Sequence, residues 1–170
     1  LEVPRYIMSR FIDNFIQWFP HQLIAKDWCV KRLKSVGAAA LCLDTGLGKS
    51  AVGLLVAIEM DLKPMVITTR SNVVMWENLM QDFGGKGRVI TWGRWSQAKR
   101  DWRDEVPKGS IVIADEGKFV GLETHSGRKL AEASNLFRVL ILSATPCTRA
   151  TDCRALFHLL KICSYDQFYN

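Results

Sequence analysis

The sequence predicts an α/β domain with a mainly parallel central sheet and helices on both of its faces. Three observations predict this fold. Five short apolar segments recur along the chain, segments of helical periodicity separate several of them, and turn residues precede others. Short apolar strands that alternate with helices are typical of a parallel sheet covered on both sides. Ligands of such sheets bind at the carboxyl ends of the strands.

The expected elements follow one another without a repeat or a linker between them. Residues 9–18 and 21–33 carry apolar side chains at helical spacing, and Gly37 is expected to end the second helix. Strands are expected at residues 38–43, 64–69, 88–91, 110–115 and 138–143. Further helices are expected at residues 49–60, 72–83 and 128–134.

The composition is that of one globular domain. The chain has 170 residues, of which 48% are hydrophobic and 24% are charged, enough to build one sizeable core. Its apolar runs are far shorter than a bilayer span, so we expect no membrane association. The net charge of +6 permits a polyanionic partner without requiring one.

The five cysteines are odd in number and have no CxxC spacing. Three of them lie near the C-terminus around His158, where a metal site is conceivable. Free thiols are the stronger interpretation, and they favour an intracellular, reducing compartment such as cytoplasm, nucleus or infected-host cytoplasm.

A phosphate-binding loop is predicted at residues 43–50, which read Leu-Asp-Thr-Gly-Leu-Gly-Lys-Ser. Glycines let backbone N–H groups surround phosphate oxygens, and the N-terminus of the following helix adds the positive end of its dipole. Lys49 would reach the β- and γ-phosphates, and the Ser50 hydroxyl would ligate Mg²⁺. Leu43 stands where this pattern usually has glycine. A strand–helix turn with a chance Lys-Ser pair is the alternative, and the strand–turn–helix context disfavours it.

A second motif ends the strand expected at residues 110–115. Its β-branched residues run into Asp115 and Glu116. Near a phosphate-binding loop, such an aspartate belongs to the Mg²⁺ shell and the glutamate accepts the proton of the attacking water. Adjacent acids at a strand end are also common as turn or N-cap residues, but their position downstream of the loop favours the functional interpretation.

A third motif ends the strand expected at residues 138–143. Ser143, Ala144 and Thr145 follow its apolar run, and Pro146 stops the strand. The two hydroxyl groups could hydrogen-bond the acids of the second motif. An ordinary strand end with serine–threonine turn chemistry is the alternative.

Together, these three motifs resemble, in order and spacing, motifs I, II and III of superfamily 2 helicases. Residues 19–22, Phe-Pro-His-Gln, are similar to the leader in which a glutamine recognises adenine, and Gln22 takes that position. Residues 66–70, followed by a helix with Trp76, resemble motif Ia of the Swi/Snf-type branch. The resemblance runs over residues 19–148 and implies a three-layer RecA-like P-loop NTPase domain.

The resemblance also implies a function, that of the ATP-binding lobe of an ATP-hydrolysing, DNA-dependent translocase using ATP and Mg²⁺. The implied catalytic residues are Lys49, Asp115 and Glu116. The implied nucleotide-binding residues are Gln22, Thr45, Gly46, Leu47, Gly48, Lys49 and Ser50. Ser50 and Asp115 would hold Mg²⁺. The implied nucleic-acid contacts, with DNA favoured over RNA, are Thr69, Arg70, Ser71 and Arg94. The residues implied to couple the two sites are Lys118, Ser143, Ala144 and Thr145.

A patch of alternating basic and aromatic residues follows the third expected strand. Arg94 lies between Trp92 and Trp95, and Trp102 lies between Arg100 and Arg103. This composition suits phosphate contacts and base stacking. The alternative is a surface helix whose tryptophans pack inward while its basic residues are solvated.

Two departures from the family pattern alter what we expect. Lys118 occupies a motif II position that is usually His, Asp or Gln, so coupling is expected to differ, or the lysine to contact a phosphate. The family also has a second RecA-like lobe with arginine fingers, which the residues after Thr148 do not contain. We therefore expect a lobe from the same or a partner chain, and feeble hydrolysis without it.

The expected parts of the chain are a helical lead-in at 1–18, the RecA-like lobe at 19–150 and a helical extension toward a second lobe at 151–170. Two other functions stay open: an RNA or DNA unwinding helicase of the same superfamily, and a single-lobed nucleotide-binding regulator without turnover. A P-loop kinase or GTPase is disfavoured, because it would not supply the Ser-Ala-Thr-Pro strand end or the upstream glutamine.

Overall fold

The central sheet of the protein is entirely parallel in the computed structural model, which describes residues 18–84, 87–97, 101–116, 124–145 and 150–162. Within these ranges the sheet has five strands in the spatial order β1-β5-β4-β2-β3. The strands are β1 (Ala38–Cys42), β2 (Lys63–Thr68), β3 (Arg88–Thr91), β4 (Ser110–Asp115) and β5 (Arg138–Ser143). The predicted α/β fold with a mainly parallel sheet is confirmed.

The register of the strands brings their carboxyl ends to one edge of the sheet. Cys42 at the end of β1 lies opposite Ser143 of β5. Asp115 at the end of β4 lies opposite Leu142, one residue earlier on β5. The residues that follow β1, β4 and β5 therefore emerge side by side, with β5 between the other two.

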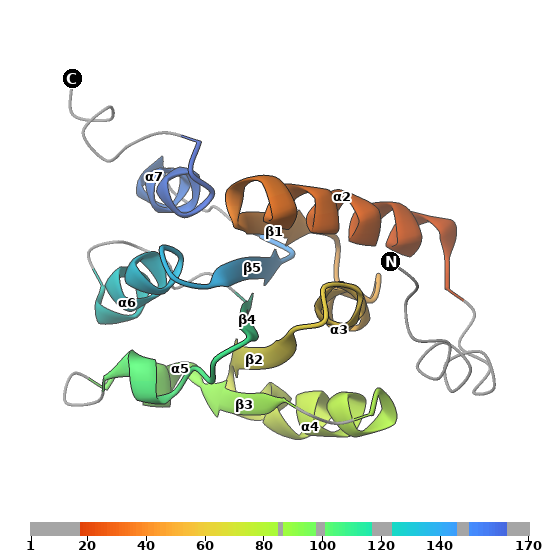
Figure 1. The fold of residues 1–170 in the computed structure, drawn as a ribbon, viewed down its shortest axis with the longest axis horizontal. Coiled ribbons are helices and arrows are strands. Elements are labelled where there is room, and N and C mark those ends of the chain that lie inside the picture. The colour runs from red at the N-terminus through yellow and green to blue at the C-terminus, as the bar shows by residue number, and fades with distance from the viewer. Residues whose placement is uncertain (1–17, 85–86, 98–100, 117–123, 146–149, 163–170) are drawn as a thin grey trace.

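Helices cover both faces of the sheet and complete three layers (Figure 1). The first face carries α2 (Pro20–Val36), α3 (Lys49–Glu59) and α4 (Val73–Asp82). The second face carries α5 (Trp92–Trp95), α6 (His125–Ala133) and α7 (Ala150–Leu159). In the described ranges, two 3₁₀ turns lie between these elements, η1 (Arg70–Asn72) and η2 (Trp102–Asp104).

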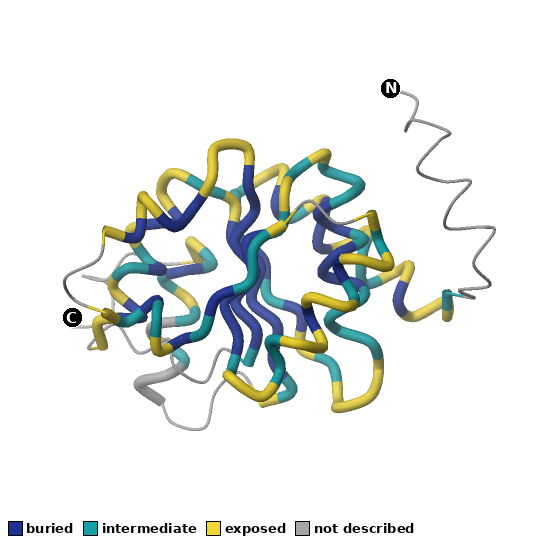
Figure 2. The backbone as a smooth tube through the Cα atoms, turned by 90° about the horizontal axis from the view of Figure 1, so that it is seen from below, coloured by how far each residue is buried: buried dark blue, intermediate teal, exposed yellow. Residues whose placement is uncertain are grey.

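Two apolar clusters, one under each helical layer, form the core. Along β4, Ile111 and Ile113 belong to the cluster under α2, α3 and α4, whereas Val112 and Ala114 belong to the opposite one. This alternation follows from the two-residue period of a strand. All six residues of β4 are buried, and Figure 2 shows the strands as the buried centre of the molecule.

The first described helix, α2, has clear start and stop signals. Pro20 occupies its first turn, where a residue without a backbone N–H costs nothing. Gly37 ends it with φ of +82°, and its N–H donates to the Leu33 carbonyl, as is common at helix C-termini. The predicted stop at Gly37 is confirmed, and the early start at Pro20 places Gln22 in the first turn.

Other elements differ from the prediction by a few residues. The helix expected at 128–134 begins three residues earlier, because Thr124 caps α6 by accepting a hydrogen bond from the N–H of Gly127. The four-residue helix α5 was not predicted from the sequence as a separate element. The helix expected at 9–18 lies outside the described residues except for Trp18, which precedes α2.

Candidate active site

The predicted phosphate-binding loop connects β1 to α3 at the carboxyl edge of the sheet. Gly46 and Gly48 have φ of +86° and +81°, a left-handed conformation that glycine adopts without the steric cost of a Cβ. Gly48 is the N-cap of α3. The Lys49 ammonium donates to the carbonyls of Leu43 and Asp44 over 2.8 and 3.0 Å. The loop thus folds back over its lysine.

Gln22 contacts this loop from the first turn of α2. Its Oε1 accepts from the backbone N–H of Phe19 over 3.1 Å, and its Nε2 donates to the Leu47 carbonyl over 3.2 Å. A Cβ added to Gly48 would overlap Nε2. The structure therefore brings the predicted adenine-recognition residue into contact with the predicted phosphate loop, 25 residues away in the chain.

Asp115 is buried at the end of β4 and receives two hydrogen bonds on the same carboxylate oxygen. Thr68 Oγ1 lies 2.7 Å and Trp76 Nε1 lies 2.8 Å from Oδ2. Both donors are completely buried. Hydrogen bonds to a charged group are shorter and stronger than neutral ones, so this pair orients the carboxylate and leaves Oδ1 outside the two bonds.

Glu116 follows Asp115 with φ of +54°, one of three non-glycine residues with positive φ in the described part of the chain. Such a conformation costs of order 1–3 kcal/mol and persists only where the surroundings enforce it. One enforcing contact comes from Trp92, whose Nε1 donates to the Asp115 carbonyl over 2.9 Å. This bond fixes the plane of the peptide that leads into Glu116.

Sequence reasoning did not assign a role at the site to Thr68, Trp76 or Trp92. From the sequence, Trp76 is only part of the segment that resembles motif Ia, and Trp92 is only part of the basic–aromatic patch. The contacts depend on β2 lying beside β4, which the sequence does not reveal. The sequence offered one signal for Thr68: it is a polar residue directly at the end of an apolar strand, where ligand sites of such sheets lie.

Ser143 lies between the loop and Asp115, as the order of the strands requires. It is 1% exposed, and its Oγ accepts from the backbone N–H of Thr145 over 3.1 Å. This hydrogen bond is a local turn contact, whereas the sequence suggested that the Ser143 hydroxyl bonds to Asp115 or Glu116. Ala144 and Thr145 follow at increasing exposure, and Lys118 lies outside the described residues.

The first group of predicted nucleic-acid contacts lies at the same edge of the sheet, after β2. The hydroxyl oxygens of Thr69 and Ser71 are 3.0 Å apart, and Arg70 is exposed. Thr69 directly precedes η1, which leads into α4. The side chains of this group are therefore accessible to a ligand on the edge of the domain.

Arg94, the other predicted contact, is paired within the protein. Its guanidinium contacts Oε1 of Glu105 at 3.1 Å, and Arg88 contacts Oε2 of the same carboxylate at 2.6 Å. The Glu105 side chain is 5% exposed, whereas that of Arg94 is 41% exposed. Buried charges in proteins are normally paired, and the Glu105 carboxylate is paired with both Arg88 and Arg94. The Arg94 side chain is therefore held by Glu105 within the protein.

The tryptophans of the basic–aromatic patch pack inward, as the alternative interpretation expected. Trp95 donates to the Ser126 carbonyl over 3.1 Å, and Trp102 donates to Glu132 Oε2 over 2.9 Å. Both are at most 3% exposed. They contribute to the core under α6 and offer no face for base stacking.

The chemistry of the site fits a magnesium–nucleotide complex. Mg²⁺ prefers hard oxygen ligands and retains several waters, and Ser50 and Asp115 supply a hydroxyl and a carboxylate at the edge where the loop lies. No cluster of three or more metal-ligating side chains occurs among the described residues.

Two cysteines near the loop differ in accessibility. Burial raises the pKa of the Cys29 thiol to about 12. Partial burial also raises the pKa of Cys42, at the end of β1, and the nearby Lys49 ammonium lowers it in part. Both cysteines are free, as is Cys153. Cys42 is exposed and directly precedes the loop.

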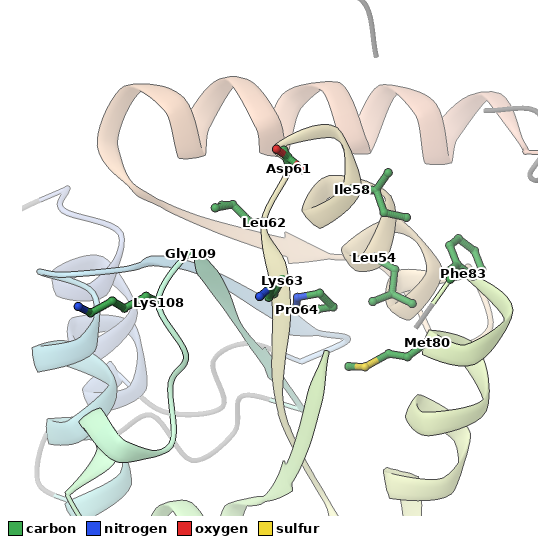
Figure 3. A pocket seen from close by; sticks show the side chains of 11 residues that line it. Leu54, Ile58, Asp61, Leu62, Lys63, Pro64, Met80, Phe83, Lys108 and Gly109 are labelled. Atoms are coloured by element: carbon green, nitrogen blue, oxygen red, sulfur yellow. The ribbon is translucent and has the colours of Figure 1, made fainter. Parts of the chain in front are cut away.

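A pocket of about 620 Å³ lies at the opposite edge of the sheet (Figure 3). Leu54 and Ile58 of α3 and Met80 of α4 line it, together with Pro64 near the start of β2 and Gly109 just before β4. It therefore opens at the amino ends of the strands. Parallel α/β sheets bind ligands at the carboxyl ends, so this pocket is separate from the candidate site.

Comparisons with known proteins bear on the fold. No protein-family model matches the sequence. The chain is 17% identical to a structure of the Sulfolobus solfataricus SWI2/SNF2 ATPase core in complex with dsDNA, with a TM-score of 0.65 over 86% of this chain and 35% of that one. It is 18% identical to a structure described as a hypothetical ATP-dependent RNA helicase from Sulfolobus tokodaii, with a TM-score of 0.65 over 90% of this chain and 54% of that one. The three-layer RecA-like fold expected from the motifs is confirmed.

One curated relative is similar in sequence. A protein of Acanthamoeba polyphaga mimivirus that bears the name of an ATP-dependent RNA helicase is 21% identical over 162 residues, covering 75% of this chain and 30% of its own length. The chain thus spans about a third to a half of the helicase-type proteins it matches. Its resemblance to superfamily 2, predicted from the motifs, is confirmed. None of the described helices is both long enough and apolar enough to cross a bilayer.

Proposed function

We propose that this RecA-like helicase lobe binds ATP and forms half of the ATPase site of a DNA-dependent translocase of the Swi/Snf-like type. One observation carries the proposal: the loop with Lys49 and the acids Asp115 and Glu116 lie at the same edge of the sheet, on either side of β5. A packed apolar core does not by itself require a lysine, an aspartate and a glutamate together at one edge of the sheet. The arrangement matches what hydrolysis of a triphosphate needs.

Each residue has a distinct role in this proposal. The backbone N–H groups of residues 46–50 and the Lys49 ammonium bind the phosphates. Ser50 and Asp115 would hold Mg²⁺, which would neutralise charge on the transferred phosphoryl group. Glu116, leaving the strand at its unusual φ, accepts a proton from the attacking water. Gln22 positions the base end of the nucleotide against the loop.

The proposed partners are a nucleic acid and a second RecA-like lobe, from the same or a partner chain. The exposed Arg70 with the hydroxyls of Thr69 and Ser71 suits contacts to a phosphate backbone, to which Arg and hydroxyl side chains commonly donate. Arginine fingers on the second lobe would raise the rate by orders of magnitude. We place residues 19–150 in the lobe, and the free thiols suit a reducing compartment.

A second function is an ATP-dependent helicase that acts on RNA. The names of the Sulfolobus tokodaii structure and of the mimivirus relative favour it. An ATPase assay of the full-length protein distinguishes the two, with duplex DNA, single-stranded DNA and RNA added in turn. Stimulation by duplex DNA is the expected result. Stimulation by RNA alone would replace the proposal with the second function, and absence of hydrolysis under all conditions would support a regulator without turnover.

A further inference from the structure

Two tryptophan side chains reach the same acidic residue from opposite faces of the sheet. Trp76 belongs to α4, in the layer on the first face, and donates to Oδ2 of Asp115. Trp92 begins α5, in the layer on the second face, and donates to the backbone carbonyl of Asp115. They are 39 and 23 residues away from Asp115 in the chain. One residue at the end of β4 is thus held on both sides.

Each tryptophan is directly connected to a segment that carries a predicted nucleic-acid contact. Arg70 and Ser71 belong to η1, which continues without a break into α4, and Trp76 lies in the first turn of that helix. On the other side, the Thr91 side chain caps α5 by accepting from the N–H of Arg94. Trp92 lies between these two residues, so any shift of the segment moves its indole.

The two hydrogen bonds act on different parts of the proposed catalytic pair. The bond from Trp76, with that from Thr68, fixes which carboxylate oxygen of Asp115 faces these two donors. The bond from Trp92 fixes the Asp115 carbonyl and thereby the peptide plane from which Glu116 departs at φ +54°. A carboxylate misplaced by about 1 Å can lose two orders of magnitude in rate.

We propose that Trp76 and Trp92 are positioning residues that link engagement of nucleic acid to the geometry of Asp115 and Glu116. The inference rests on the proposed function, because it assigns those two acids to the nucleotide site. It adds the route: the segment after β2 acts on the Asp115 side chain through Trp76, and the segment after β3 acts on the Asp115–Glu116 peptide through Trp92.

The test uses Trp76→Phe and Trp92→Phe in the full-length protein. Each variant keeps an aromatic ring in the core and removes the indole N–H. Trp102→Phe is the matched control, since it also removes a buried indole donor, in this case one that bonds to Glu132 away from the site. All three substitutions remove one buried hydrogen bond, so similar changes in melting temperature are expected from each.

The decisive readout is the coupling between the two ligands, measured without turnover. The affinity for a fluorescent, non-hydrolysable ATP analogue with Mg²⁺ is titrated with and without saturating nucleic acid, and the ratio of the two affinities is the coupling factor. We expect this factor to fall at least threefold toward one in both Trp76→Phe and Trp92→Phe and to stay unchanged in Trp102→Phe. Nucleic-acid stimulation of kcat should fall in the same two variants, with the KM for ATP within twofold of wild type.

The outcomes separate the inference from the function on which it rests. If the wild-type protein shows coupling and both variants retain it to the same extent as Trp102→Phe, the tryptophans have only a packing role and the inference is wrong. If the wild-type protein does not bind the analogue, the proposed function fails, and the inference with it. Indole N–H resonances of the wild-type protein, assigned by sequential NMR correlations in that protein itself, provide an independent measurement. Those of Trp76 and Trp92 should shift when nucleic acid binds, and unchanged positions would contradict the proposal even if a variant does not fold.

Discussion

Gln22 fills the space that a side chain on Gly48 would need. The amide nitrogen of Gln22 donates to the Leu47 carbonyl, and a Cβ at Gly48 would overlap that nitrogen. The absence of a side chain at Gly48 therefore permits two things at once, a left-handed N-cap for α3 and a glutamine contact from α2.

This relationship predicts a difference between two glycine substitutions in the same loop. Gly48→Ala should destabilise the protein by more than Gly46→Ala. Both glycines have positive φ, but a Cβ at Gly48 would push the Gln22 amide off its hydrogen bond to Leu47, whereas a Cβ at Gly46 meets nothing within 4 Å. The left-handed conformation costs about 1–2 kcal/mol in each. Denaturant unfolding measures the two free energies. Adding Gln22→Ala should relieve the excess cost at Gly48 and leave Gly46→Ala unchanged; equal losses in the two single variants would contradict the proposed overlap.

Removal of the loop lysine should abolish nucleotide binding. Lys49→Ala takes away both the cation and the hydrogen bonds to the carbonyls of Leu43 and Asp44, and we expect affinity for a fluorescent ATP analogue to fall more than tenfold, about 1.4 kcal/mol or more. Lys31→Ala, on the exposed side of α2, is the control for loss of positive charge. An unchanged affinity of Lys49→Ala would overturn the assignment of the loop.

Neutralising Glu116 should separate binding from hydrolysis. Glu116→Gln keeps the shape of the side chain but cannot accept the proton from water, so kcat of the full-length protein should fall by about 10²–10⁴. Nucleotide affinity should stay within a few fold of wild type. Glu77→Gln, exposed on α4, controls for the loss of one negative charge. Persistent hydrolysis by Glu116→Gln would show that another group takes the proton.

The two arginines predicted to contact nucleic acid should contribute unequally. Arg70 is exposed, whereas Glu105 already pairs with Arg94. Arg70→Ala should therefore reduce the slope of log affinity against log salt by about 0.9 for a duplex, and Arg94→Ala should reduce it less. Binding titrations of the full-length protein at several salt concentrations measure both slopes. A larger change for Arg94→Ala would mean that nucleic acid displaces Glu105 from it.

The thiol of Cys42 should report on the charge of Lys49. Burial raises the pKa of Cys42, and the Lys49 ammonium opposes that rise by stabilising the thiolate. The rate of alkylation should therefore climb with pH through the alkaline range, and Lys49→Ala should move the curve to higher pH, because the thiolate loses its neighbouring cation. Mass spectrometry of the modified peptides measures the rates. Cys29, whose pKa is raised to about 12 by burial, is the internal control and should stay unmodified; a curve unmoved by Lys49→Ala would exclude the charge effect.

Strands were the part of the fold that sequence reasoning predicted best. Residues 88–91, 110–115 and 138–143 have the predicted bounds because their apolar runs begin after turn residues or polar segments and end at polar side chains. Helix α5 was not recognised. Four residues are too few for helical periodicity, and only the Thr91 cap marks its start.

The candidate site was predicted in its parts but not in its contacts. Lys49 and Asp115 were selected from local patterns, because a glycine-rich loop and an acidic strand end consist of consecutive residues; their roles at the site stay predictions. The bonds of Asp115 to Trp76 and Trp92 depend on which strands are neighbours in the sheet. That order cannot be read from a local stretch of sequence. The pairing of Arg94 with Glu105 was missed for the same reason, since both its burial and its partner come from tertiary packing.

The strand order also determines when each strand can pair during synthesis. Strand β1 pairs with β5 in the described sheet, and β5 lies about a hundred residues later in the chain. Strand β1 must therefore wait for β5, the last of the described strands, before its backbone groups find their sheet partner, and such long-range pairing is slow to form. Until residues 138–143 emerge, β1 and the nascent phosphate loop behind it present an unpaired apolar edge, the kind of surface that chaperones bind.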